Sequence, residues 1–162
     1  MKKILSILLL LFSLLSFSQF KVVGSSNEWS LIGKGNNAIK LYQNDSMAKI
    51  EYIDYGTSIT RTNVLSPTTA YEFKFSAKQD DLNKLYDLII EKYNARKVEE
   101  ITLEFPEGNI YLNFYKDIMG SFGFNFKFDN KTEIIDKNSI GSKRQTYALN
   151  IKQINKLFGK TK

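Results

Sequence analysis

The chain of 162 residues contains neither histidine nor cysteine. Without cysteine it has no disulfide framework, no lipoprotein anchor residue, and no thiolate for nucleophilic attack or zinc binding. Without histidine it has no Ser-His-Asp or Cys-His relay, and it lacks the most common side-chain ligand of transition metals. The two absences favour a protein that binds rather than catalyses, and we expect no metal ion or other cofactor.

Arginine is also scarce. Lys and Arg together number 23 against 17 Asp and Glu, a formal net charge of +6, but only three of the basic residues are Arg. A nucleic-acid surface favours Arg, because its planar guanidinium binds phosphate and guanine through two hydrogen bonds. Lys, Ile and Asn are abundant and have AT-rich codons, so codon usage explains the excess of basic residues better than a binding partner does. We therefore expect no nucleic-acid partner.

The first residues have the pattern of a secretory signal peptide. Lys2 and Lys3 precede an apolar run over residues 4–17, and Ser16 and Ser18 are the small residues that signal peptidase requires. The run is shorter than the roughly 20 residues of a membrane-spanning helix. We predict removal of residues 1–18, leaving 19–162 as a single domain with a net charge of +4, because two Lys are lost with the signal.

This prediction places the protein in a periplasm or outside the cell. We expect it not to be a lipoprotein, and we expect no membrane span after the signal is cleaved. The sequence leaves the choice between the two locations open, and it leaves the oligomeric state open as well.

Alternation of apolar and polar residues predicts several strands. They are expected at 38–42 and 47–55 as a hairpin, at 71–75, at 100–105 and 110–115 as a second hairpin, and at 122–128, with a short return strand at 133–136. Residues 20–37 are expected to form a loose lead-in with one short strand at 29–32. Residues 57–70 are expected to form a ragged strand followed by a loop.

Two helices are predicted. Ser76 and Gln79 form the pattern of a capping box, and apolar residues with helical spacing follow, so a long helix is expected over residues 77–95. Asn150 and Gln153 predict the start of a short C-terminal helix that ends at Gly159. The fold class is therefore α+β: one domain with an antiparallel β-sheet of about seven to nine strands in two meanders, packed by one long central helix and one short C-terminal helix.

An aromatic stripe follows one face of the predicted strands. It could line an apolar ligand cavity, but burial against the long helix explains it better, so we assign it to the core. Its members are Phe105, Phe114, Phe122, Phe124, Phe126 and Phe128.

The reverse face of the same strands is the candidate binding surface. If the strands are sequential neighbours, Tyr and Asn side chains gather there, and these residue types are typical of surfaces that bind sugars or proteins. The alternative is an ordinary solvated sheet face. The candidate ligand- or partner-binding residues are Tyr111, Asn113, Tyr115, Asn125 and Lys127. The expected partner is an unidentified protein or a component of the cell envelope.

Two other functions stay open. A small hydrolase acting on glycans would need only two carboxylates, and Glu99, Glu100, Glu104 and Glu107 form the best cluster, although Glu100 and Glu104 are too far apart along one strand to pair. A secreted inhibitor or immunity-type protein would use residues 57–70 as its wedge.

Other short patterns have simpler explanations. Residues 129–133 are expected to be a turn and not a calcium loop, because Lys131 lies among the oxygen ligands. Residues 139–143 show a nonspecific Ser and Lys combination, and Gly33-Lys34-Gly35 lacks the spacing of a phosphate loop. Trp29 is expected to cover the edge of the sheet.

Overall fold

A computed structural model describes residues 28–55, 70–130 and 144–160. It contains two four-stranded antiparallel sheets and two helices, which confirms the α+β class, the two meanders and both predicted helices. The first sheet contains β1 (Ser30–Asn36), β2 (Ile39–Gln43), β3 (Met47–Ile53) and β4 (Ala70–Ser76) in sequence order. The second contains β5 (Glu99–Phe105), β6 (Gly108–Lys116), β7 (Phe122–Asn130) and β8 (Arg144–Gln145).

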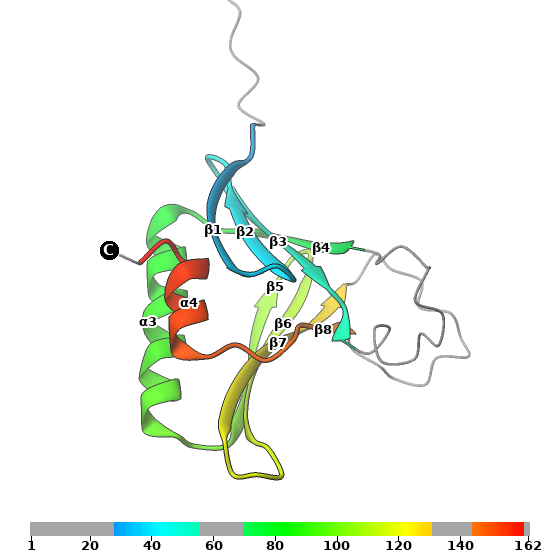
Figure 1. The fold of residues 1–162 in the computed structure, drawn as a ribbon. Helices are drawn as coiled ribbons and strands as arrows, with labels where there is room; N and C mark the ends of the chain where they lie inside the picture. The colour runs from blue at the N-terminus through cyan, green and yellow to red at the C-terminus, as the bar shows by residue number, and fades with distance from the viewer. Residues whose placement is uncertain (1–27, 56–69, 131–143, 161–162) are drawn as a thin grey trace, which may run out of the picture.

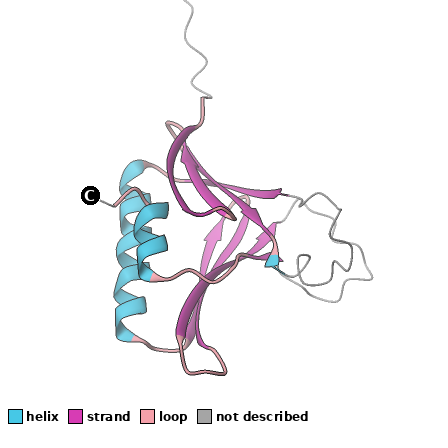
Figure 2. Ribbon diagram, viewed as in Figure 1, coloured by secondary structure: helices cyan, strands magenta, loops and turns pink. Residues whose placement is uncertain are grey.

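Helix α3 (Gln79–Ala95) connects the two sheets, and helix α4 (Ile151–Leu157) follows the second sheet. The two helices lie side by side along one side of the molecule, and both sheets extend away from them (Figure 1). Figure 2 shows the resulting division, with α3 and α4 gathered on one side and the strands extending away from them. In the described part of the chain, neither helix combines the length and apolar composition that crossing a membrane requires.

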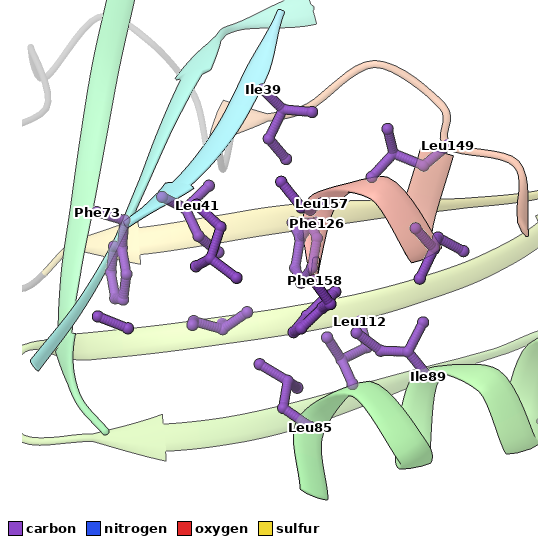
Figure 3. Packing of buried hydrophobic residues seen from close by; sticks show 14 of the residues in the cluster. Ile39, Leu41, Phe73, Leu85, Ile89, Leu112, Phe126, Leu149, Leu157 and Phe158 are labelled. Carbon is purple, nitrogen blue, oxygen red and sulfur yellow. The ribbon is translucent and has the colours of Figure 1, made fainter. Parts of the chain in front are cut away.

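The core lies between the inner faces of the two sheets and the two helices. Ile39 and Phe73 from the first sheet, Leu112 and Phe126 from the second, and Ile89 from α3 point into it (Figure 3). These side chains are 1% exposed or less. The predicted aromatic stripe is part of this core: Phe114, Phe124, Phe126 and Phe128 are buried, and Phe105 and Phe122 are partly buried against it.

The sheets also contact each other directly through aromatic rings. Phe128 of β7 stacks on Phe73 of β4 with ring centroids 5.2 Å apart, and Phe105 of β5 lies 5.0 Å from Phe75 of β4. The stripe was expected to be covered by the long helix. The first sheet covers much of it instead, because β1–β4 form a separate sheet with an apolar face of their own.

Close packing of α4 on β1 explains the glycines of that strand. A Cβ atom on Gly33 would lie 2.0 Å from the carbonyl oxygen of Lys156 and 2.6 Å from that of Leu157. A Cβ on Gly35 would lie 3.2 Å from the carbonyl oxygen of Gln153. The Gly33-Lys34-Gly35 segment therefore serves helix packing, since only glycine lets the helix backbone approach so closely.

The strand expected within the lead-in was predicted too short. Strand β1 runs from Ser30 to Asn36, well beyond the predicted 29–32, because its glycines lower the β propensity while the contact with α4 requires them. Trp29 is half-buried beside the sheet, with the Lys49 ammonium 5.1 Å from its ring centroid. Strand β8 was not predicted at all.

The start of the long helix was also predicted slightly wrong. Helix α3 begins at Gln79, and its N-cap is Lys78, whose backbone N–H donates to Oδ2 of Asp81 at 3.0 Å. Ser76 still belongs to β4, and its hydroxyl donates to Oε1 of Glu107 at 2.7 Å. The Asn150 and Gln153 capping box of α4 is confirmed, with reciprocal hydrogen bonds of 2.9 and 3.0 Å.

Several predictions fall outside the described residues. These are the signal segment at 1–18, the ragged strand and loop at 57–69, the return strand at 133–136, and the patterns at 131–133 and 139–143. Of the turn predicted from residue 129, Asp129 and Asn130 are described, and they belong to the end of β7 instead.

Candidate functional site

The outer face of the second sheet brings the five predicted binding residues together. Strands β6 and β7 are antiparallel neighbours, and their register pairs Tyr111 with Lys127, Asn113 with Asn125, and Tyr115 with Gly123. These side chains lie on the face opposite the buried phenylalanines, because successive residues of a strand point to opposite sides. The sequence therefore predicted this grouping correctly.

A cavity of about 750 Å³ opens over this face. Four of the five predicted residues line it, and Tyr111 does not. The other lining residues come from three further segments: the end of β1 with its turn to β2, the residues just after β3, and the end of β8 with the stretch that follows it. The full lining is Asn36, Asn37, Ala38, Tyr55, Asn113, Tyr115, Asn125, Lys127, Gln145, Thr146, Tyr147 and Ala148.

The floor of the cavity is an amide pair. Nδ2 of Asn113 donates to Oδ1 of Asn125 at 2.9 Å across the two strands, and Asn125 is only 7% exposed. Each Asn side chain has two donor and two acceptor positions, so one bond between them leaves capacity for a ligand. The hydrogen bond fixes the orientation of the two amides relative to each other.

Tyr115 lies across Gly123 of the neighbouring strand. A Cβ on Gly123 would lie 2.9 Å from Cζ and 3.0 Å from Oη of Tyr115, so the ring occupies the space of the missing side chain. Burial raises the pKa of the Tyr115 phenol, and the nearby Tyr55 and Asp117 groups raise it further. The phenol therefore remains neutral throughout the physiological range and can both donate and accept a hydrogen bond.

The segment that follows β8 forms one wall of the cavity and is hydrogen-bonded along the edge of β7. The backbone N–H of Thr146 donates to the carbonyl of Phe126 at 2.9 Å, and the Thr146 hydroxyl accepts from the N–H of Phe126 at 3.1 Å. Further along, the N–H of Leu149 donates to the carbonyl of Phe124 at 2.7 Å. Because this segment is bonded at both ends, Tyr147 and Ala148 are held between two fixed points at the cavity wall.

The first sheet supplies the rim that adjoins this wall. The N–H of Gln145 donates to Oδ1 of Asp54 at 2.8 Å, so the end of β3 is joined to the wall of the second sheet. Next to this link, Tyr55 packs edge-to-face on Tyr147 with ring centroids 5.2 Å apart. Asp54 is 4% exposed and acts as a link between the sheets rather than as a lining residue.

The sequence did not predict Asn36, Tyr55, Gln145 or Tyr147 as site residues. They belong to three segments distant in the chain, and their approach depends on how the two sheets pack. The only signal in the sequence was the residue types themselves, because Asn and Tyr had already marked the outer face of β6 and β7.

One cation, Lys127, lies among the described lining residues, and it is already paired. Nζ of Lys127 lies 2.7 Å from Oε2 of Glu100 on β5. No carboxylate belongs to the described residues that line the cavity. The described part of the lining therefore presents amides, hydroxyls and aromatic rings, with little net charge.

Three of the four glutamates of the hydrolase alternative have different partners. Glu99 forms ion pairs with Lys97 at 3.0 Å and Lys92 at 3.8 Å, and the hydrogen bond from Lys97 lowers the pKa of its carboxyl group. Glu100 pairs with Lys127, and Glu107 accepts from Ser76. Among residues 28–55, 70–130 and 144–160, no three acidic side chains gather as metal ligands.

Compared with protein-family models, with curated proteins and with solved structures, the chain matches none.

Proposed function

We propose that this chain is an exported, non-enzymatic binding protein whose ligand occupies the cavity over the outer face of β6 and β7. The cavity carries the proposal, because a volume of about 750 Å³ lies within the range of roughly 300–1,000 Å³ that is usual for small-molecule sites. Its lining also contains four of the five residues that the sequence alone had marked.

The construction of the site supports binding. The Asn113–Asn125 amide pair, the Tyr115 ring over Gly123 and the wall bonded to β7 hold the lining side chains before any ligand arrives. A site that is already ordered loses less conformational entropy when a ligand binds.

The chemistry of the lining favours binding over catalysis. A general acid or base needs a titratable group near neutral pH, and the chain has no histidine and no cysteine. The lining offers amides, a Thr hydroxyl, phenols and one lysine that is held by Glu100. These groups recognise a ligand through hydrogen bonds and ring contacts.

Export is proposed from residues 1–18, whose charged start and apolar run are typical of a signal peptide. The intact mass of protein recovered from the envelope fraction or the medium tests it. A chain that begins at Gln19 supports export, and a chain that still begins at Met1 contradicts it.

The binding proposal is tested by immobilising the purified protein and capturing ligands from an envelope extract. Tyr115→Ser changes a residue of the cavity lining, and Tyr111→Ser changes a residue of the same strand face outside the lining. We expect the captured component to be lost with Tyr115→Ser and kept with Tyr111→Ser. Equal capture by both variants would overturn the assignment of the site.

A further inference from the structure

We propose that the ligand of this cavity is a neutral oligosaccharide segment. The inference rests on the proposed function and adds the chemical class of the ligand. It follows from three properties of the lining: its charge, its hydrogen-bonding groups and the placement of its aromatic rings.

The charge of the lining disfavours an ionic ligand. Among the described residues that line the cavity, Lys127 is the only charged one, and its ammonium lies 2.7 Å from the Glu100 carboxylate. An anionic ligand would have to compete with Glu100 for this lysine. A cationic ligand would find no carboxylate among the described lining residues. A neutral ligand meets neither obstacle.

The polar groups of the lining match hydroxyl groups. Side-chain amides each carry donors and acceptors, and a sugar hydroxyl is likewise both donor and acceptor. Asn113 and Asn125 form the floor of the cavity. Further polar groups surround them on the rim and wall, contributed by Asn36, Asn37, Gln145 and Thr146.

Three tyrosines provide the apolar contacts that a sugar ring needs. The face of a pyranose carries C–H groups with partial positive charge, and the face of an aromatic ring is negative, so the two stack favourably. Tyr115 lies against the floor across Gly123, while Tyr55 and Tyr147 form an edge-to-face pair at 5.2 Å on the rim. Rings on both floor and rim suit an extended chain of sugars better than one small polar molecule.

The test is calorimetric titration of the purified protein with neutral oligosaccharides of glucose, mannose and N-acetylglucosamine. Oligogalacturonate serves as the acidic comparison, and uncharged peptides rich in Ser and Gln serve as the peptide comparison. We expect saturable binding of at least one neutral oligosaccharide, and a change of less than about twofold in its affinity with added salt, because screening acts on charges.

Tyr55→Ser and Tyr115→Ser should each weaken that binding by about tenfold, equal to about 1.4 kcal/mol. The control Ile118→Ser, at the fully exposed tip of the β6–β7 turn, should leave it unchanged. Circular dichroism should show all three variants folded, and Tyr55, which is 39% exposed, provides a second variant should Tyr115→Ser fail to fold.

Other outcomes overturn the inference. A preference for oligogalacturonate, a preference for the peptides, or no binding to any neutral oligosaccharide would each exclude the neutral sugar class. In those cases the binding function itself is judged separately, by the Tyr115-dependent capture from envelope extract. Failure of both experiments would reject the cavity as a binding site.

Discussion

Asn113 donates a side-chain hydrogen bond to Asn125 at 2.9 Å, from one strand of the second sheet to the next, at the floor of the cavity. The two residues are directly opposed in the β6–β7 register, and Asn125 is buried. A buried amide without a partner is costly, so each residue stabilises the position of the other. The pair links the fold of the sheet to the shape of the site.

A double-mutant cycle measures this link. Asn113→Ala, Asn125→Ala and the double variant are compared by urea unfolding. We expect a coupling energy of about 0.5–1.5 kcal/mol, the usual net value of one hydrogen bond. Additive effects of the two single variants would show that the pair contributes nothing to stability.

Gly123→Ala should change the site more than the fold. The added methyl group would lie 2.9 Å from Cζ of Tyr115, so the ring must move away from the floor. The obstacle is the far end of a half-exposed side chain, so we expect a loss of less than about 1 kcal/mol in the free energy of unfolding. Ligand affinity should fall by about tenfold, equal to about 1.4 kcal/mol. Unchanged affinity would mean that the position of Tyr115 does not matter for binding.

Gly33→Ala should destabilise the fold. Its Cβ would lie 2.0 Å from a backbone oxygen of α4, which cannot rotate away. Overpacking typically costs about 1–3 kcal/mol, and the rigid obstacle places this substitution in the upper half of that range. Urea unfolding measures the loss.

The exposed neighbour Lys34→Ala serves as the control and should change the free energy of unfolding by no more than about 0.5 kcal/mol. Equal stability of the two variants would contradict the close packing of α4 on β1.

The Tyr115 phenol should make stability fall at high pH. Its pKa is raised in the folded state, so the folded protein holds this proton more tightly than the unfolded chain. The stabilisation is complete below the unfolded pKa of about 10 and is lost as the pH rises through the folded value.

Urea unfolding of the wild type and of Tyr115→Phe, measured as a function of pH, checks this. The difference between their free energies of unfolding should be constant up to about pH 10. Above that pH the free energy of unfolding of the wild type should fall relative to that of Tyr115→Phe. A difference that stays constant at every pH would show that the pKa of Tyr115 is the same in the folded protein as in the unfolded chain.

The three long strands of the second sheet, β5, β6 and β7, could be predicted from the sequence. Residues 110, 112 and 114 alternate with Tyr111, Asn113 and Tyr115, and this period of two fixes which side chains share a face. Hairpin pairing then sets the register, so the floor of the cavity followed from local pattern alone.

The rest of the site could not be predicted, because it depends on long-range packing. Tyr55 and Gln145 lie at the cavity where the end of the first sheet meets β8, joined by the hydrogen bond from Gln145 to Asp54, and no local pattern encodes that contact. Strand β8 has two residues, too few for any alternation to be visible. The length of strand β1 was underestimated because Gly33 and Gly35 lower its β propensity. These glycines allow close packing of α4, which lies more than a hundred residues later in the chain.

The central claim is that ligand binds in the cavity over β6 and β7. The most direct measurement is a titration of the isotope-labelled protein with its captured ligand, followed by nuclear magnetic resonance of the side-chain amides. The side-chain amide signals of Asn113, Asn125 and Gln145 should shift until the ligand saturates the protein. The signal of Asn94, on an exposed part of α3, should stay in place. Saturable shifts that leave Asn113, Asn125 and Gln145 unmoved would contradict the central claim.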